Sequence, residues 1–347
     1  MEVKNNNSEA IEHKLDVSVS PHIKDKATVQ KVMLDVIIAL IPAGFSGIYF
    51  FGIRSIYVIL TCVIMSVISE WIMQIIMGVE VTVDDLSAVV TGILLAYCLP
   101  PSVPLWVAGI GAVTAIALVK NLFGGLGYNI FNPALAARAI LVASWPVAMT
   151  LYIAPKMGSI SLLDGIDGIT SATPLTLIKE SYNYLADTTN LDPEKIVQMK
   201  RNILDLGNKD LWLNLFTGVK GGSLGETSNL ALLSGGCYLL IKKIIDWRVP
   251  VTFIGTVLIF SLVLGRNPVF NILSGGLFLG AFFMATDYVT SPVTPVGRLI
   301  FGVCCGLFVV LIRFYGGYPE GVCYSILIMN MLVPAIDKFT IPKTFGY

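Results

Sequence analysis

The segment IYVILTCVIMSVISEWIMQIIM, Ile56–Met77, decides the fold class of this chain. Glu70 is its only charged residue, and an α-helix needs about 20 mostly apolar residues to cross the hydrocarbon core of a bilayer. The whole chain has the same character, because 55% of its residues are hydrophobic, 13% are charged and the mean hydropathy is +0.78. The sequence therefore predicts an all-α integral membrane protein.

Apolar windows divide the chain into about ten predicted transmembrane helices. Two of them, Leu86–Leu99 and Ile272–Ala285, are shorter than a bilayer requires. The others are Val32–Phe51, Ile56–Met77, Leu105–Val119, Phe131–Ala154, Leu230–Ile245, Val249–Leu264, Leu299–Ile312 and Val322–Ile336. The predicted divisions are a tail (1–30), five spans (31–154), a polar loop (155–228), five further spans (229–337) and a second tail (338–347).

The distribution of Lys and Arg over the short loops predicts the orientation, because basic residues are retained on the cytoplasmic side. With the amino-terminal tail inside, the outer short loops carry only Arg54, Arg266 and Arg313. Both tails are therefore expected in the cytoplasm, and the 155–228 loop outside. The basic residues assigned to the inner side are Lys4, Lys14, Lys24, Lys26, Lys31, Lys120, Lys242, Lys243, Arg248, Arg298, Lys338 and Lys343.

The two halves of the chain are expected to form an inverted repeat, because an odd number of spans reverses the topology of the second half. Leu86-Ser87-Ala88 opens the third span much as Leu273-Ser274-Gly275 opens the eighth. Short segments at matching positions of two halves point to a site at the bilayer midplane. Two shortened helices without a function are the alternative.

Charged residues inside the predicted spans need a partner or a purpose, since a charge at mid-bilayer costs about 2.5–3.5 kcal/mol on insertion scales. Glu70 and Arg138 are candidates to pair with each other. Asp287, at the end of the eighth span, offers the oxygen ligands that a small cation prefers, or else caps that end. Glu70 and Asp287 are therefore the candidates for an ion path.

Composition excludes several other classes of site. The 23 basic residues balance the 23 acidic ones, so no nucleic-acid partner is predicted. The two histidines, His13 and His22, lie in the tail, and none of the six cysteines forms a C-x-x-C pair. We therefore expect no histidine metal site and no iron–sulfur cluster in this chain.

The octapeptide DGITSATP, Asp167–Pro174, lies in the long polar loop. Pro174 disfavours α geometry at Thr173 and suits the first position of a helix, while Leu175–Ala186 has apolar residues at helical spacing. Thr173 is therefore predicted to be the N-cap of a short helix, with an exposed hydroxyl. Capping is an ordinary role for threonine, but the same helix end also favours a bound phosphate.

The octapeptide resembles the flavinylation motif of the RnfD and NqrB family, Asp-Gly-x-Ser/Thr-x-Ala-Thr, whose last threonine carries FMN through a phosphodiester bond. Ser20–Ile23 with Met33–Val36, Asn129–Ala134 and Phe283–Asp287 also look like family motifs in family order. The resemblance implies covalent FMN on Thr173 and a fold like that of urea and ammonium transporters, with two inverted five-helix repeats. It further implies that a separate flavin transferase recognises Asp167, Gly168, Thr170, Ser171 and Ala172.

The short amino-terminal tail is more similar to RnfD, the D-type component of the Rnf complex, than to NqrB. The Rnf complex links ferredoxin oxidation to NAD⁺ reduction and to transport of Na⁺ or H⁺ across the bacterial inner membrane. This resemblance implies an electron-carrying component that is not catalytic on its own, with membrane lipid and subunits of the A, B, C, E and G types as partners. Two alternatives stay open: the NqrB component of the Na⁺-translocating NADH:quinone reductase, and a non-redox channel or transporter of the same fold.

Members of this family can also hold a second, non-covalent riboflavin. The glycine-rich segment Gly124–Asn129 is expected at the cytoplasmic mouth of a ligand pocket, because broken backbone at membrane depth is tolerated where it lines a cavity. Asn129, Asn132 and Asn267 offer amide groups for the edge of a flavin ring. Asn129 and Asn132 are the candidates for this second flavin site.

Overall fold

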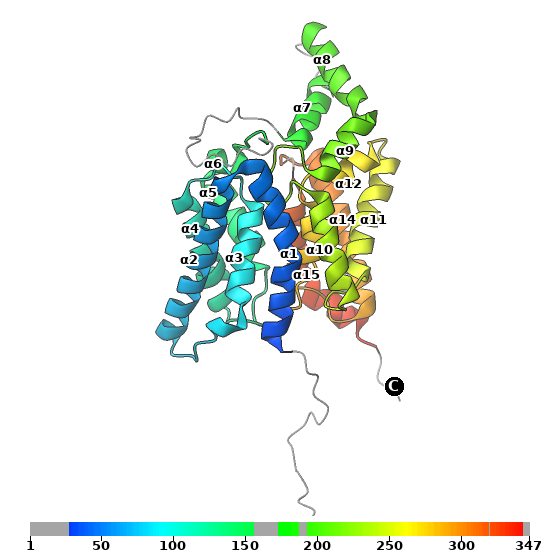
Figure 1. The fold of residues 1–347 in the computed structure, drawn as a ribbon. Coiled ribbons are helices and arrows are strands. Elements are labelled where there is room, and N and C mark those ends of the chain that lie inside the picture. Colours follow the sequence, from blue (N-terminus) through cyan, green and yellow to red (C-terminus); the bar gives the residue numbers. More distant parts are fainter. Residues whose placement is uncertain (1–27, 156–172, 187–192, 319, 343–347) are drawn as a thin grey trace, which may run out of the picture.

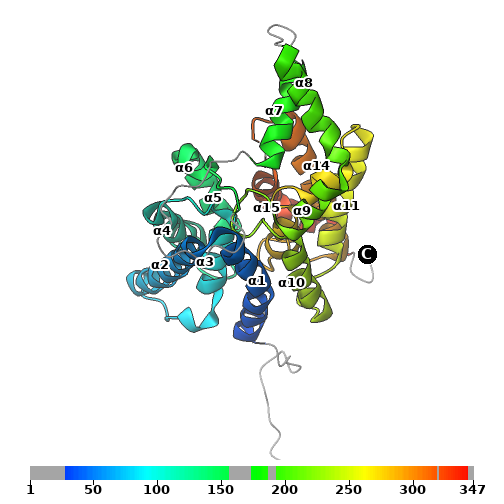
Figure 2. The same cartoon turned by 45° about the horizontal axis from the view of Figure 1, so that its top comes forward.

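Two groups of helices, one from each half of the chain, lie side by side (Figures 1 and 2). The structure is a computed structural model that describes residues 28–155, 173–186, 193–318 and 320–342. The first group comprises α1 (Val29–Phe51), α2 (Ile53–Met77), η1 (Val83–Asp85), α3 (Ser87–Cys98), α4 (Leu105–Thr114), η2 (Ala115–Asn121), α5 (Pro133–Ser144) and α6 (Pro146–Thr150). The second comprises α10 (Asn229–Ile241), α11 (Arg248–Val263), α12 (Pro268–Leu273), α13 (Leu277–Leu279), η4 (Gly280–Met284), α14 (Pro295–Tyr315) and α15 (Val322–Thr340).

The two ends of the bundle carry different parts of the chain. Helix α1 begins and α15 ends at one end, which we call the terminal face (Figure 1). The opposite end, the loop face, carries α7 (Pro174–Ala186), α8 (Pro193–Leu204), η3 (Asp205–Gly207) and α9 (Lys209–Thr217). The described helices of the long loop therefore lie at the end of the bundle opposite to the terminal face, as predicted. The cytoplasmic location of the terminal face stays a prediction.

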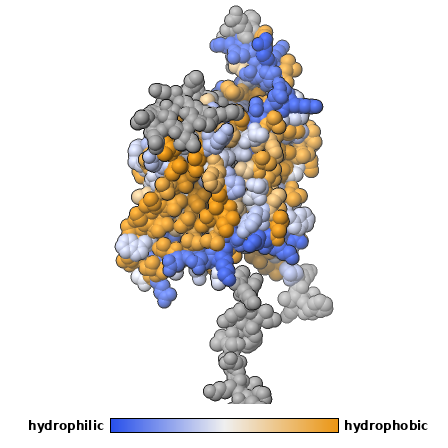
Figure 3. Space-filling model, in the orientation of Figure 1, coloured by the Kyte–Doolittle hydropathy of each residue, from blue (hydrophilic) through white to orange (hydrophobic). Residues whose placement is uncertain are grey.

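An apolar belt covers the visible side of the molecule between these two faces (Figure 3). Helices α1, α2, α14 and α15 are long and apolar enough to cross a membrane, and α3, α4 with η2, α5, α10 and α11 are shorter apolar helices. The prediction of an all-α integral membrane protein is confirmed.

Helices at matching positions of the two halves meet at the interface between them. Helix α1 packs against α10, and α5 packs against α15. Within the first half α2 contacts α3 and α4, and within the second α11 contacts α12 and α14. This pairing is the arrangement expected of two inverted five-helix repeats.

Two predicted spans are wrong in their boundaries. Phe131–Ala154 is divided at Trp145, because α5 ends at Ser144 and Pro146 starts α6. Ile272–Ala285 is not one helix: α12 ends at Leu273, and a break at 274–276 precedes α13. Gly275 in this break has φ +69°, a left-handed conformation that glycine adopts readily.

The third span is found as α3, and a left-handed residue precedes it as well. Leu86 has φ 64°, a conformation that costs a residue with a Cβ about 1–2 kcal/mol. Strained backbone of this kind gathers at functional sites. The short helix of each half therefore begins beside an unusual backbone conformation.

The close approach of α10 to α1 gives a test of this interface. A Cβ added at Gly235 would lie 2.0 Å from the carbonyl oxygen of Ala39 in α1. We expect Gly235→Ala to lower the free energy of unfolding by about 1–3 kcal/mol, as overpacking does. Gly255→Ala in α11 is the matched control, since its Cβ would meet nothing within 4 Å. Denaturant titration in nanodiscs compares the two, and equal effects would contradict the interface.

Candidate functional site

Thr173 caps the start of α7 on the loop face. Its side-chain oxygen accepts a hydrogen bond from the backbone N–H of Thr176 at 3.3 Å and lies 2.7 Å from the Thr176 hydroxyl oxygen. Its carbonyl oxygen accepts from the N–H of Leu177 at 3.1 Å. The predicted N-cap and helix are confirmed, whereas the expected exposure is wrong, because Thr173 is only 5% exposed. Asp167, Gly168, Thr170, Ser171 and Ala172 lie outside the described residues, and their role stays a prediction.

Contacts with the second half fix α7 in place. Leu175 is buried, and a Cβ on Gly275 in the break would lie 3.3 Å from its Cδ1 atom. Lys179 Nζ donates to the carbonyl oxygens of Gly316 at 2.5 Å and Tyr318 at 2.8 Å. These contacts hold Thr173, two residues before Leu175, close to the break between α12 and α13.

A small cavity of about 40 Å³ lies between α7, α12 and α14. The guanidinium carbon of Arg266 lies 3.3 Å from the ring centroid of Tyr182 in its wall. Arg266 Nη1 and Arg313 Nε are buried and have no hydrogen-bond partner among the described residues. Cationic N–H donors of this kind suit a phosphate oxygen. Arg266 lies beside Tyr182, in the second half of α7, and Thr173 does not line this cavity.

Arg138 joins the two halves through two carboxylates. Its Nη1 lies 3.2 Å from Glu226 Oε1, and its Nη2 contacts Glu320 Oε2. Glu226 lies in the segment before α10, and Glu320 in the segment before α15, the helix that packs on α5. The predicted pairing of Arg138 with Glu70 is wrong, because both residues have partners elsewhere.

Glu70 of α2 instead contacts Lys120 Nζ of η2. Lys120 Nζ also donates to Ser87 Oγ at 2.5 Å, and Asp85 accepts from the backbone N–H of Ser87 at 2.7 Å. Lys120 is 2% exposed, so its assignment to an inner loop is wrong. The reason is that η2 continues α4 as a π-helix to Asn121 and carries the lysine into the protein.

Removal of Lys120 tests this ion pair. Lys120→Met leaves the Glu70 carboxylate buried without its cation, which we expect to destabilise the protein by about 3 kcal/mol. Glu70→Gln/Lys120→Met removes both charges and should recover most of that loss. Denaturant titration of the single and double variants measures both effects. A double variant no more stable than Lys120→Met would contradict the pairing.

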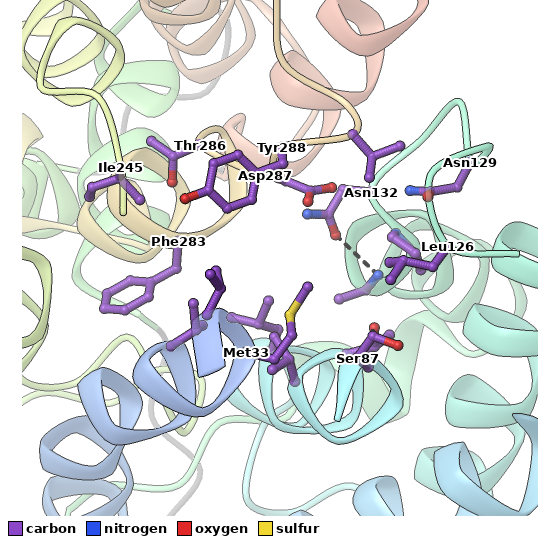
Figure 4. A pocket seen from close by; sticks show the side chains of 18 of the residues that line it. Met33, Ser87, Leu126, Asn129, Asn132, Ile245, Phe283, Thr286, Asp287 and Tyr288 are labelled. Atoms are coloured by element: carbon purple, nitrogen blue, oxygen red, sulfur yellow. Dashed lines mark hydrogen bonds between the residues drawn. The ribbon is translucent and has the colours of Figure 1, made fainter. Parts of the chain in front are cut away.

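A cavity of about 90 Å³ lies between the two halves near the terminal face (Figure 4). Asn129 and Asn132 line it from the segment before α5, and Asp287 lines it from the segment after η4. Asn132 Oδ1 caps α5 by accepting from the N–H of Ala134 at 3.1 Å, and Asp287 Oδ2 accepts from Thr290 Oγ1 at 3.1 Å. The structure therefore brings three predicted site residues together.

Asn267 does not belong to this cavity. It caps α12 by accepting from the N–H of Phe270 at 3.1 Å, and its amide donates to the carbonyl of Leu206 at 2.9 Å. Glu70 does not line the cavity either, although its partner Lys120 does. The ion-path roles of Glu70 and Asp287 stay predictions.

Two buried charges that precede α10 were not predicted from the sequence. Lys220 and Glu226 are 6% and 2% exposed, although their segment looked like part of a solvated loop. The glycines of this segment are the sequence feature that could have predicted its burial. Glycine has no side chain, so a glycine-rich loop can pass close to other parts of a packed interior. A Cβ on Gly225 would lie 2.3 Å from the Tyr97 side chain.

Comparisons with known proteins agree on one family. The NQR2, RnfD, RnfE family profile matches residues 16–346. The chain is 46% identical to the D component of the Na⁺-translocating ferredoxin:NAD⁺ oxidoreductase complex of Acetobacterium woodii, over 96% of this chain and 95% of that protein. It is 44% identical to the D component of the proton-translocating ferredoxin:NAD⁺ oxidoreductase complex of Clostridium ljungdahlii, over 95% and 96%. It is 35% identical to the D component of the ion-translocating oxidoreductase complex of Mannheimia succiniciproducens, over 95% and 98%.

Proposed function

The chain belongs to the NQR2, RnfD, RnfE family, and we propose that it is the D component of an ion-translocating ferredoxin:NAD⁺ oxidoreductase complex. Two relatives named as the D component of such complexes match it almost from end to end. This favours the ferredoxin complex over the quinone reductase and over a non-redox transporter. One of those relatives is named for Na⁺ and the other for protons, so the proposal leaves the coupling ion open. Its partners are the other subunits of the complex, of the A, B, C, E and G types.

In this proposal, Thr173 carries FMN through a phosphodiester bond. The observation that supports it is the position of Thr173 at the start of α7, where its side-chain oxygen accepts from the N–H of Thr176 on the loop face. A flavin transfers electrons singly or in pairs, and that chemistry belongs to the cofactor. The chain contributes position: the start of α7 favours the phosphate charge, and a covalent tether keeps the flavin at a high effective concentration. We place this loop face outside the cytoplasm.

The burial of Thr173 bears on how the bond forms. A transferase that recognises Asp167–Thr173 needs this segment extended and accessible, yet Thr173 is 5% exposed in the folded chain. Attachment therefore precedes the packing of α7 against α12 and α14, or needs α7 to lift from them. The flavin transferase is the partner required for maturation.

The cavity near the terminal face is the proposed place for a second, non-covalent flavin. Phe282 and Phe283 supply aromatic walls, and Asn129 and Asn132 supply amides at the edge. An apolar cavity with a few polar groups is the usual chemistry of a small-molecule site, and at about 90 Å³ this cavity must widen to admit a flavin ring. Riboflavin is the proposed occupant, because the site lacks an arginine to pair with a phosphate among its described lining residues.

Mass spectrometry of the mature chain, produced together with an active flavin transferase, tests the covalent proposal. We expect the peptide containing Thr173 to be heavier by one FMN less one water, and the chain to fluoresce on a denaturing gel. An unmodified peptide under these conditions would remove the covalent flavin from the proposal. The assignment to the D component would then rest on the family alone.

A further inference from the structure

A basic cleft of about 570 Å³ lies between the end of α10, the start of α11 and the start of α14. Lys243, Arg248 and Arg298 line it, and Asp246 is the one carboxylate among its described lining residues. Three positive charges therefore face one negative charge. The volume is within the range of sites that bind small molecules, roughly 300–1,000 Å³.

The two arginines of the cleft are held by the same carboxylate oxygen. Arg248 Nη1 and Arg298 Nη1 each lie 2.8 Å from Asp246 Oδ2, and Arg298 Nε donates to the carbonyl oxygen of Pro292 at 3.0 Å. Within the described part of the chain, the Nη2 group of neither arginine has a hydrogen-bond partner. The two side chains are 33% and 30% exposed. Fixed guanidinium groups with free N–H donors suit the oxygens of a phosphate.

Lys243 adds its charge at a strained position of the backbone. Its φ is 57°, a left-handed conformation that glycine usually supplies just after a helix. The ammonium group is exposed and has no ion pair or hydrogen bond with any described residue, whereas Lys242 Nζ lies 3.6 Å from Asp35 Oδ1. Glycine would end α10 with less strain, so the lysine points to a role for its charge. Strained residues of this kind gather at functional sites.

An apolar rim adjoins the basic cleft. Ile241, Val251 and Val293 lie within two residues of its lining in the sequence and are 82%, 56% and 74% exposed. Trp247 is 56% exposed, and the guanidinium carbon of Arg248 lies 5.6 Å from its ring centroid. Exposed tryptophan is typical of the boundary between membrane and water, and the apolar belt gives way to hydrophilic residues at the terminal face (Figure 3). The cleft and its rim therefore suit a ligand with an anionic head and an apolar tail.

We propose that this cleft binds the headgroup of one anionic phospholipid. Its phosphate lies against Arg248, Arg298 and Lys243, and its acyl chains follow the apolar rim. Basic pockets between transmembrane helices are typical sites for anionic headgroups. Basic side chains at helix ends also reach bulk headgroups without selecting one lipid. That general role does not explain why one carboxylate fixes two guanidinium groups beside a strained lysine.

The basic cleft is distinct from the cavity proposed for the second flavin. The two share part of a wall formed by four residues, Ile244, Ile245, Thr286 and Tyr288 (Figure 4). The Tyr288 hydroxyl contacts the carbonyl oxygen of Ile244 within this wall. Lys243, Arg248 and Arg298 line the cleft but not the cavity. The groups that recognise a phosphate therefore belong to the cleft alone.

Lipid titration of the detergent-solubilised full-length chain tests the proposal. Phosphatidylglycerol should raise the unfolding temperature in a saturable way, because a ligand bound only by the folded state stabilises it. Phosphatidylcholine with the same acyl chains should not, and native mass spectrometry should show one retained phosphatidylglycerol per chain. Lys243→Gln and Arg248→Gln should each weaken phosphatidylglycerol binding about 5-fold, as expected for one basic residue at a membrane surface. Equal responses to the two lipids overturn the proposal.

Lys242→Gln is the matched control, because Lys242 precedes Lys243 directly but does not line the cleft. It should bind phosphatidylglycerol as the wild type does. An equal loss in both lysine variants would show general attraction to anionic lipid and overturn the site. Glycerol 3-phosphate, at equal ionic strength, separates a lipid from a soluble phosphate compound. Stabilisation by it as strong as that by phosphatidylglycerol would also overturn the proposal.

Lys243→Gly keeps the proposal testable if Arg248→Gln does not fold. Glycine relieves the left-handed strain at this position, so the variant should unfold at a higher temperature than the wild type in phosphatidylcholine. It should nevertheless bind phosphatidylglycerol about 5-fold more weakly, because it lacks the ammonium group. A more stable variant with unchanged phosphatidylglycerol affinity would overturn the assigned role of Lys243 and with it the site.

Discussion

We expect Thr173→Ala to abolish the proposed flavin fluorescence of the denatured chain and to slow ferredoxin-to-NAD⁺ electron transfer by the assembled complex about 100-fold or more. The first effect follows because alanine offers no hydroxyl for the phosphodiester bond. The second follows because a tether strengthens overall binding by about 10²–10⁴-fold over the untethered ligand. Loss of the N-cap itself costs only about 1 kcal/mol, so the chain should still fold and assemble. Gel fluorescence and turnover of the purified complex measure the two effects.

Thr176→Val is the matched control. It removes the hydroxyl that lies 2.7 Å from Thr173 Oγ1 but leaves the proposed attachment point in place. This variant should keep its fluorescence and most of its turnover. Fluorescence that survives in Thr173→Ala would place the flavin on another residue of the loop. Normal turnover without fluorescence would show that the covalent flavin is not in the electron path.

Much of the fold follows from local features of the sequence. Helices α1, α2, α14 and α15 are predicted to within a few residues, because the length of an apolar run decides whether it spans a membrane. Helix α7 is predicted for a different reason, since Thr173 and Pro174 fix its start through backbone restrictions that act between neighbours. Neither prediction needs any knowledge of tertiary contacts.

The charge pairs were not predictable in the same way, because they join residues that lie far apart in the sequence. Glu70 meets Lys120 and Arg138 meets Glu226 and Glu320, and each choice depends on which helices pack together. The location of Lys120 was also predicted wrongly, because a lysine at the end of an apolar run normally marks a solvated loop. The Gly275-Gly276 pair before α13 indicates a helix break in the sequence itself. The sequence comparison of the two halves uses Gly275 only as part of the similarity between Leu86-Ser87-Ala88 and Leu273-Ser274-Gly275.

The second large effect is expected at Arg138. Arg138→Met leaves Glu226 and Glu320 facing each other without the cation that joins them, with side chains only 3% and 14% exposed. Breaking a buried ion pair by removing one partner costs about 3–5 kcal/mol. Because two carboxylates lose their cation here, we expect a loss of stability near the upper end of that range. Arg54→Met is the matched control, because Arg54 donates to the backbone carbonyls of Pro101 and Ser102. It should cost about 1–2 kcal/mol.

The pH dependence of Arg138→Met distinguishes lost charge compensation from lost packing. Burial and the neighbouring Glu320 already raise the pKa of Glu226, while Arg138 lowers it, so the variant should raise it further. A carboxyl whose pKa is raised in the folded state costs nothing below its unfolded pKa, lowers stability as the pH rises from the unfolded to the folded pKa, and has its full cost above the folded pKa. Arg138→Met should therefore approach wild-type stability near pH 5 and fall progressively below it up to pH 8. Unfolding titrations at these pH values measure the free energy of unfolding of the variant relative to the wild type. A loss of stability that does not change with pH would assign the effect to packing. It would reject the role of Arg138 as the cation between the two halves.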